Sequence, residues 1–176
     1  MLSSLIIYSS TDGHTINICK RIINFLGNHK TQIMPLDEAK KINLSDFSQI
    51  IIGASIRYGR HSKELYKFID LNKNILNNKK SIFFSVNVVA RKSNKNTADT
   101  NPYIKKFLKI SKWKPFKIGV FAGKIDYPRY GFFDKHIIRL IMYLTDGPTD
   151  LSKTYEFTDW DSVDLFAKEI ANNADY

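Results

Sequence analysis

One stretch near the N-terminus decides the fold: Leu5-Ile6-Ile7-Tyr8-Ser9-Ser10-Thr11-Asp12-Gly13-His14-Thr15. It opens with apolar residues, which predict a short buried strand, and continues with small and hydroxylated residues, which predict a loop. From Thr15 to Asn28, apolar residues then recur at helical spacing. A strand that passes through a short loop into a helix is the repeating unit of an α/β fold.

The same alternation continues along the chain. Further strands are predicted at residues 32–36, 49–54, 80–86 and 117–122, and further helices at 63–76, 102–111 and 160–172. Most of these strands are apolar throughout, which is typical of strands buried on both faces of a parallel sheet. We therefore predict a doubly wound α/β fold with helices on both faces of the sheet. Its strand-to-helix loops, where ligands bind, should lie along one edge.

An insertion interrupts this alternation at about residues 125–150, between the fifth predicted strand and the last helix. Residues 132–144 within it are mostly apolar and predict a helix. Such a helix is too short to span a bilayer but suits the membrane interface, and we take Ile138 and Ile141 as membrane-facing residues. Packing against the protein itself, or in a dimer contact, is the alternative.

Length and composition favour one domain spanning residues 1–176. Hydrophobic residues make up 43% of the chain and charged residues 25%, which is enough apolar material for a core. The single cysteine, Cys19, excludes an intrachain disulfide and a multi-cysteine zinc site, and no metal is expected. We find neither a signal peptide nor a spanning segment, so we expect a cytoplasmic protein.

Positive charge is concentrated in the middle of the chain. The net charge is +10, and residues 57–120 carry 16 basic and 3 acidic side chains, a balance of +13. Such a charge attracts nucleic acid, anionic lipid headgroups or an acidic small molecule. Compositional drift towards lysine is the alternative cause. No nucleic-acid-binding signature accompanies the charge, so no nucleic-acid partner is expected.

The first loop suits a phosphate group. Hydroxyl side chains flank its only glycine, Gly13, at the start of the predicted helix. Backbone N–H groups are free at a helix N-terminus, and the helix dipole favours negative charge there. The alternative is an ordinary helix cap by Asp12 or Thr15, without a ligand. Neither Rossmann nor Walker glycine spacing is present.

The segment 10–15, Ser-Thr-Asp-Gly-His-Thr, resembles the flavodoxin phosphate loop T-x-T-G-x-T, and the resemblance extends over essentially the whole chain. It implies a five-stranded sheet in the order 2-1-3-4-5, with a long insertion in the region of the fifth strand. Asp12 departs from the pattern, which usually has a hydroxyl there. Because a carboxylate repels phosphate, we assign Asp12 to helix capping. The hydroxyl contacts are assigned to Ser9, Ser10, Thr11 and Thr15.

Longer matches are more specific. Residues 52–59, 84–92 and 127–130, with Tyr155-x-x-Thr158-Asp159-Trp160, resemble the flavodoxin-type, menaquinone-dependent protoporphyrinogen oxidases. This resemblance implies bound FMN and oxidation of protoporphyrinogen IX to protoporphyrin IX in haem biosynthesis, with six electrons passed to menaquinone or ubiquinone. It also implies a peripheral protein on the cytoplasmic face of the inner membrane. The oligomeric state stays open, a homo-oligomer included.

The resemblance places the cofactor among three loops. The flavin performs the redox step, so no catalytic residue of the chain is named. Tyr58 is a candidate for stacking on the flavin ring, with ordinary loop packing as the alternative. Arginines on these loops suit the propionates of the substrate, with a solvated basic rim as the alternative. The expected substrate contacts are Arg57, Arg60, Arg91, Lys92 and Arg129. The expected cofactor contacts are Ser9, Ser10, Thr11, Asp12, Gly13, His14, Thr15, Ala54, Ser55, Ile56, Arg57, Tyr58, Gly59, Ser85, Val86, Asn87, Val88, Val89, Ala90 and Arg91.

Two other classes of protein compete with this enzyme. A non-catalytic, flavodoxin-like one-electron carrier would share the fold. Such carriers are typically acidic around the flavin, so the basic middle third and the apolar insertion speak against it. A nucleic-acid-binding module would account for the charge, but the positive residues are spread over several predicted elements.

Overall fold

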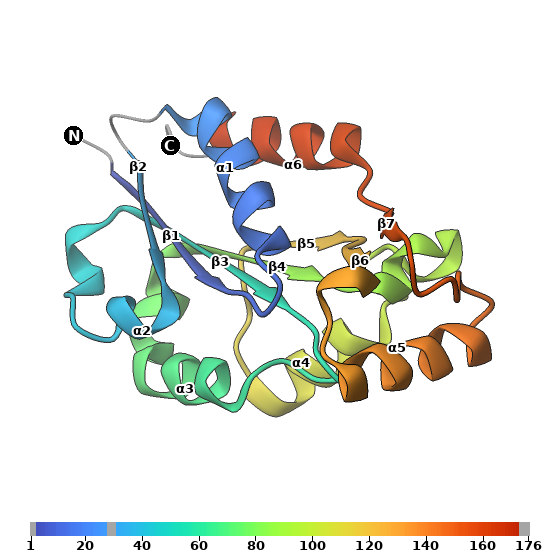
Figure 1. Ribbon diagram of the computed structural model, residues 1–176. Helices are drawn as coiled ribbons and strands as arrows, with labels where there is room; N and C mark the ends of the chain where they lie inside the picture. Colours follow the sequence, from blue (N-terminus) through green and yellow to red (C-terminus); the bar gives the residue numbers. More distant parts are fainter. Residues whose placement is uncertain (1–2, 28–30, 173–176) are drawn as a thin grey trace.

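Five parallel strands form the central sheet of the computed structural model, which describes residues 3–27 and 31–172 (Figure 1). The strands are ordered β2-β1-β3-β4-β5, as predicted. Their bounds are β1 Ser4–Ser9, β2 Thr31–Pro35, β3 Gln49–Ser55, β4 Lys80–Val86 and β5 Lys117–Phe121. The strand order changes direction at β1 and β3. Ligands of open α/β sheets bind beyond the carboxyl ends of the strands at such a point.

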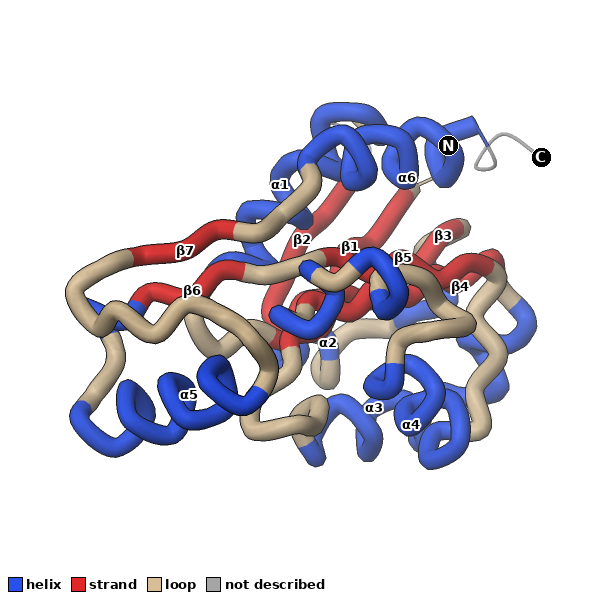
Figure 2. The backbone as a smooth tube through the Cα atoms, turned by 90° about the vertical axis from the view of Figure 1, so that its right-hand side faces the viewer, coloured by secondary structure: helices blue, strands red, loops and turns tan. Residues whose placement is uncertain are grey.

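Helices cover both faces of the sheet, as Figures 1 and 2 show. One face carries α1 (His14–Leu26) and α6 (Trp160–Asn172), and the other carries α2 (Leu36–Ala39), α3 (Lys63–Asn78) and α4 (Pro102–Ser111). Side chains of β1 alternate between the two layers, because Leu5 and Ile7 pack towards α3 and α4 while Ile6 packs towards α1 and α6. The predicted doubly wound fold is thus confirmed.

Boundaries differ from the predicted ones by a few residues. Helix α1 begins at His14 and ends at Leu26, and the predicted end at Asn28 lies outside the described residues. The sequence patterns did not predict α2 or the short 3-10 helices, which are too short to show a period. These 3-10 helices are η2 Leu44–Asp46, η3 Val88–Arg91, η4 Ser93–Lys95 and η5 Tyr127–Arg129.

Local interactions fix the edge of the sheet that carries the strand-to-helix loops. Ser62 Oγ accepts a hydrogen bond from Leu65 N at 3.2 Å and caps α3. Asn101 Oδ1 accepts one from the backbone N–H of Tyr103 at 3.0 Å and caps α4. Gly53 is required in β3, because an added Cβ would lie 2.1 Å from Cζ of Phe84 on the neighbouring strand.

The insertion forms a lobe beyond the carboxyl edge of the sheet (Figure 2). β6 (Lys124–Asp126) pairs with β7 (Thr154–Glu156) in a separate antiparallel sheet, and α5 (Phe132–Leu144) lies between them in sequence. Ile125, Tyr127 and Met142 form its small buried core. The lobe, from β6 to β7, is therefore longer than the predicted 125–150, and it lies between β5 and α6. Three-residue strands whose partner lies about thirty residues away give little sequence signal.

Candidate functional site

The loop between β1 and α1 leaves hydrogen-bonding groups free. Gly13 has a φ of 83°, in the left-handed region that favours glycine, and it occupies the N-cap position of α1. Ser10 Oγ accepts a hydrogen bond from Gly13 N at 3.0 Å and closes the turn. Thr15 is 1% exposed, yet its Oγ1 has no hydrogen-bond partner. A buried hydroxyl without a partner at a helix N-terminus is what a bound anion would satisfy.

His14 lies at the same N-terminus and is held in one orientation. The Thr158 hydroxyl donates to the carbonyl oxygen of Ala122 at 2.9 Å, so it accepts from His14 Nε2 at 2.6 Å. This arrangement assigns the imidazole proton to Nε2 and leaves Nδ1 a buried acceptor without a partner. Burial lowers the pKa of His14, so the ring is neutral at pH 7.

Asp12 does not cap α1, contrary to the prediction. The N-cap is Gly13, without a side-chain cap, and the Asp12 carboxylate instead accepts hydrogen bonds from Arg57. The ion pair joins Arg57 Nη1 to Asp12 Oδ2 at 2.8 Å. The predicted repulsion between Asp12 and a phosphate is therefore offset by a guanidinium from the next loop. Sequence reasoning could not supply this partner, because it lies 45 residues away.

Arg57 also holds the insertion in place. Its Nη2 lies 2.5 Å from Oδ2 of Asp134 in the first turn of α5, and the Tyr58 hydroxyl donates to the same carboxylate. The hydrogen bond from Tyr58, and after it the contacts with Arg57, hold the pKa of Asp134 below its ordinary value. The Arg57 guanidinium lies 5.1 Å from the centroid of the Tyr130 ring. Predicted as a substrate contact, Arg57 thus joins the first loop, the second loop and α5.

The loop after β4 rests on a buried polar network. Asn87 Oδ1 accepts from the backbone N–H of Ala90 at 3.1 Å and from Asn101 Nδ2 at 3.1 Å. Asn87 Nδ2 donates to Ser85 Oγ at 3.2 Å, and Ser85 Oγ lies 3.0 Å from His61 Nε2. Burial lowers the pKa of His61 to about 3, so this ring stays neutral. Each member fixes the next, and the network sets the position of Asn87 at the pocket floor.

Arg91 fastens the other end of α5. Its Nη2 donates to the carbonyl oxygen of Thr145 at 2.5 Å, and its Nη1 donates to that of Val88 at 3.1 Å. Lys92 Nζ lies 3.6 Å from Asp146 Oδ2 just beyond. Arg91 and Lys92 were predicted as substrate contacts, and both are engaged with the segment that follows α5.

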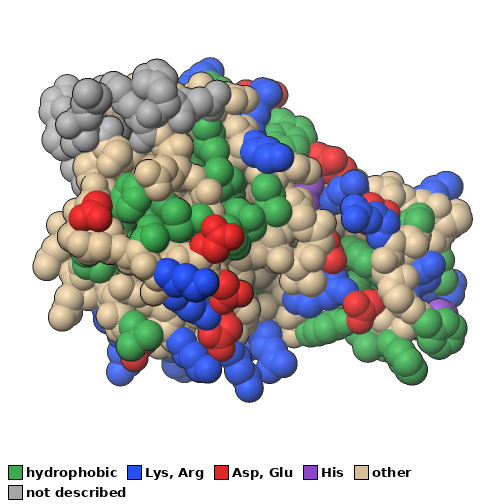
Figure 3. All heavy atoms as spheres, turned by 60° about the vertical axis from the view of Figure 1, so that its left-hand side comes forward, with side chains coloured by type: hydrophobic (Ala, Val, Ile, Leu, Met, Phe, Trp, Pro, Cys, Tyr) green, Lys and Arg blue, Asp and Glu red, His purple; other side chains and the backbone are tan. Residues whose placement is uncertain are grey.

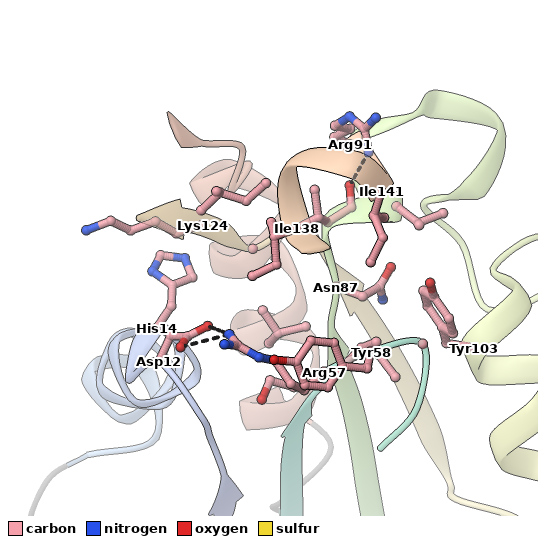
Figure 4. A pocket seen from close by; sticks show the side chains of 18 of the residues that line it. Asp12, His14, Arg57, Tyr58, Asn87, Arg91, Tyr103, Lys124, Ile138 and Ile141 are labelled. Atoms are coloured by element: carbon pink, nitrogen blue, oxygen red, sulfur yellow. Dashed lines mark hydrogen bonds and ion pairs between the residues drawn. The ribbon is translucent and has the colours of Figure 1, made fainter. Parts of the chain in front are cut away.

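A pocket opens between these loops and α5 (Figure 4). Fourteen of the predicted cofactor contacts line it: Ser10, Asp12, His14, Thr15, Ser55, Ile56, Arg57, Tyr58, Gly59, Val86, Asn87, Val88, Val89 and Arg91. Residues that the prediction did not include also line it: Tyr103, Gly123, Lys124, Ile125, Tyr130, Ile138, Ile141, Met142 and Thr145. The end near α1 is polar, and the end near α5 is mostly apolar. Such a pocket suits a ligand with a phosphate at one end and a flat aromatic ring system at the other.

Some predicted contacts lie outside this pocket. Ala54 and Ser85 are fully buried within the sheet, because alternate side chains of a strand point to opposite faces. Ser9 Oγ lies 3.3 Å from Ser62 Oγ, and Ala90 is buried in η3. None of the four lines the pocket.

A second, polar pocket adjoins the first on the far side of the β1–α1 loop. Thr11, Gly13 and Arg129 line it together with Lys124 and His14. Arg60, by contrast, closes the second loop through its backbone, exchanging hydrogen bonds with Arg57 at 3.0 and 3.2 Å. Arg129 is thus the predicted substrate contact that lies beside the turn between β1 and α1.

The two sides of α5 differ. Ile138, Ile141 and Met142 line the pocket, and Ile141, one of the two isoleucines expected to face a membrane, is also 42% exposed. The outward residues are Phe133, Ile137, Leu140 and Leu144, which are 78%, 45%, 58% and 71% exposed. Hydrophobic side chains accordingly gather at the lower right of the surface in Figure 3, where the insertion lies. The periodicity predicted the helix but not which of its residues line the pocket, because that depends on how the helix packs against the loops.

Neither a metal-binding cluster nor a membrane-spanning helix occurs among the residues that the structure describes. Between residues 3–27 and 31–172, no cluster of three or more His, Cys, Asp or Glu side chains could hold a metal ion. Over the same part of the chain, every helix is too short or too polar to cross a membrane.

A hydroxyl-rich turn at the start of α1 and two flanking loops, at the switch point of a 2-1-3-4-5 sheet, define a flavodoxin-like protein. The chain belongs to the flavodoxin domain family, whose model matches residues 5–152. It is 42% identical over 170 residues to the protoporphyrinogen IX dehydrogenase [quinone] of Leishmania major, covering 95% of this chain and 74% of that protein. It is 38% identical over 176 residues to the protein of the same name from Escherichia coli K12, covering 99% of this chain and 97% of that one.

Solved structures share the fold at low sequence identity. A flavodoxin from the Archaea aligns over 99% of this chain and 100% of that chain, with a TM-score of 0.55 and 14% identity. A WrbA-like flavodoxin from Agrobacterium tumefaciens aligns over 99% and 98%, with a TM-score of 0.56 and 13% identity. These matches show the architecture alone.

Proposed function

We propose that the protein is an FMN-dependent oxidase of protoporphyrinogen IX that passes the electrons to a quinone. The observation that carries this proposal is the 38–42% identity, over 95–99% of the chain, to proteins named for that activity. The pocket supports it, because a polar turn and an apolar slot meet in one cavity at the switch point of the sheet.

FMN fits the residues of this pocket. The Thr15 hydroxyl, the backbone N–H groups of the first turn of α1 and Ser10 would hold the phosphate. Arg57 balances the negative charge of Asp12 beside it. Tyr58, which has a φ of 48° and is 47% exposed, and the backbone of residues 86–89 would flank the ring. When bound, FMN supplies the redox chemistry that no side chain here can perform.

The chain itself positions the substrate and limits access of water. Ile138, Ile141 and Met142 form an apolar wall that would exclude water from the flat macrocycle. Arg129 and Lys124 are the cations of the adjoining pocket, and their charges complement the two propionates of protoporphyrinogen IX. Arg57 and Arg91, predicted as substrate contacts, line the pocket and also fasten the two ends of α5, and so set the position of the wall.

We place the protein at the cytoplasmic face of the inner membrane as a peripheral protein. The outward side of α5 exposes Phe133, Leu140 and Leu144, which suit the interfacial region where menaquinone or ubiquinone and the apolar substrate partition. Removal of six electrons and six protons from one substrate molecule would reduce three quinones to quinols. We therefore propose that the quinone approaches the pocket from the side of α5.

Spectroscopy and anaerobic turnover test the proposal together. The purified protein should show a flavin absorbance spectrum, and protoporphyrinogen IX should bleach it when oxygen is excluded. Adding a quinone analogue should restore the spectrum and release fluorescent porphyrin, with three quinones consumed per porphyrin. A flavoprotein that exchanges electrons only with soluble redox proteins and leaves protoporphyrinogen unchanged would instead be a carrier, and the proposal would be wrong.

A further inference from the structure

α4 and the short segment that follows it carry lysines without acidic partners, here called the α4 row. Residues 102–116 include Lys105, Lys106, Lys109, Lys112 and Lys114 and no Asp or Glu. Within residues 3–27 and 31–172, none of the five forms an ion pair, and all five side chains are exposed. The neighbouring α3 differs, because Lys67 and Lys73 pair with Glu64 and Asp70 at 3.1 and 2.9 Å. The α4 row therefore keeps its full charge available for an external partner.

This cationic row and the exposed side of α5 belong to one side of the molecule. Tyr103 at the start of α4 and Ile141 and Thr145 at the end of α5 line the same pocket. Figures 1 and 2, which are related by a quarter turn about the vertical axis, both show α4 and α5 at the bottom of the molecule. α1 and α6 lie at the top in both views. The lower side thus combines an apolar helix with a cluster of free cations.

We propose that α4 binds the anionic headgroups of a phospholipid bilayer while α5 contacts its apolar interface. This inference rests on the membrane location proposed above and adds the lipid class that the protein selects. Charge complementarity carries it, because unpaired lysines beside an exposed apolar helix match a negatively charged headgroup layer over hydrocarbon. Exposed Ile110 and Phe116, at 52% and 56%, extend the apolar contact between the lysines. The proposed flavin pocket, which lies between the loops and α5 and is lined by Tyr103 of α4, would then lie on the side of the molecule that faces the membrane holding the quinone.

Vesicle co-sedimentation tests the proposal without measuring catalysis. The FMN-loaded protein should bind vesicles of phosphatidylcholine with phosphatidylglycerol, and bind much more weakly to phosphatidylcholine alone. High salt should release it. The double variant Lys105→Gln/Lys109→Gln should lose about 25-fold in partitioning, since each lysine near an anionic surface contributes about fivefold.

A matched control variant has the same net charge as the Lys105→Gln/Lys109→Gln variant. In Lys20→Gln/Lys168→Gln, the lysines are removed from α1 and α6 on the opposite face, and partitioning should stay within about twofold of the wild type. Equal losses in the two double variants would show attraction by net charge alone and overturn the proposal. So would equal binding to both kinds of vesicle.

Two outcomes separate this inference from the proposed enzyme. Turnover with a water-soluble quinone should be the same in wild type and both double variants. Normal turnover with no preference for anionic vesicles would overturn the docking surface and leave the enzyme intact. Binding to anionic lipid by a protein that leaves protoporphyrinogen unchanged would overturn the proposed enzyme and leave the docking surface intact. A stable dimer that sedimentation velocity detects, and that Leu140→Glu dissociates, would assign the α5 face to a second copy and overturn membrane docking.

Discussion

Replacing Thr15 by valine should change stability and ligand affinity in opposite directions. The substitution keeps the β-branched shape and removes a hydroxyl that is buried and has no partner. An unpaired buried hydroxyl costs about 1–3 kcal/mol. The ligand-free variant should therefore gain about 1 kcal/mol in free energy of unfolding, or roughly 2–4 °C in melting temperature.

The same substitution should weaken FMN binding. A hydrogen bond to a charged group contributes about 1.5–3 kcal/mol, so loss of the bond from Thr15 to the phosphate should raise the dissociation constant roughly 10- to 150-fold. Riboflavin has no phosphate, and its affinity should change by less than about twofold.

Urea unfolding of flavin-free protein and fluorescence titration with FMN measure the two effects. Thr31→Val is a matched control, because Thr31 Oγ1 is also buried without a partner but lies at the amino end of β2, at the opposite edge of the sheet. It should stabilise the protein and leave FMN affinity unchanged. A Thr15→Val protein that is less stable than wild type and binds FMN equally well would refute the reasoning.

Four further predictions concern the surroundings of the pocket. Asp134→Asn removes the charge that binds Arg57, so amide hydrogen exchange in the first turns of α5 should become faster. The KM for protoporphyrinogen should rise, while the affinity for FMN stays within about threefold of the wild type. Unchanged exchange would show that this ion pair does not hold α5. Arg91→Ala should make amide hydrogen exchange faster at the end of α5, near Thr145, and should lower turnover while FMN stays bound. Loss of flavin would instead place Arg91 at the cofactor. His61 alone should contribute about 1.4 kcal/mol of destabilisation per pH unit in the ligand-free protein as the pH falls from about 6 to 4, because the unfolded chain protonates His61 while the folded chain, with the pKa lowered to about 3, does not. Urea unfolding at several pH values should show this slope in wild type and a shallower one in His61→Gln, and equal slopes would contradict it. Gly53→Ala should cost about 1–3 kcal/mol by forcing Cβ against the Phe84 ring, and a variant as stable as wild type would show that the ring can move aside.

Much of the fold could be predicted because it depends on local patterns. The bounds of β4, α4, α5 and α6 agree with the predicted ranges. These segments have long apolar periods or runs, and α4 also has the cap Asn101 followed by proline. β6 and β7 lack such a signal, because their three-residue strands exist only through pairing with each other.

The pocket likewise combines features that local sequence patterns predict with features that depend on distant segments. Its three loops follow β1, β3 and β4, so the alternation of strands and helices brings them together at one edge. The partners of individual side chains depend on distant segments instead. Asp12 pairs with Arg57 rather than capping α1, and Arg91 binds Thr145, 54 residues away. Charge and spacing in sequence name such residues as candidates without saying which of them face a ligand.

The turn between β1 and α1 carries the central claim, because the proposed enzyme requires it to hold the phosphate of FMN. Titration of the flavin-free protein with FMN and with riboflavin tests this most directly, with flavin fluorescence as the readout. One FMN should bind per chain, with riboflavin weaker by at least about 100-fold, since it lacks the charged group that the turn would bind. Equal affinities for the two flavins, or no binding of either, would contradict the account.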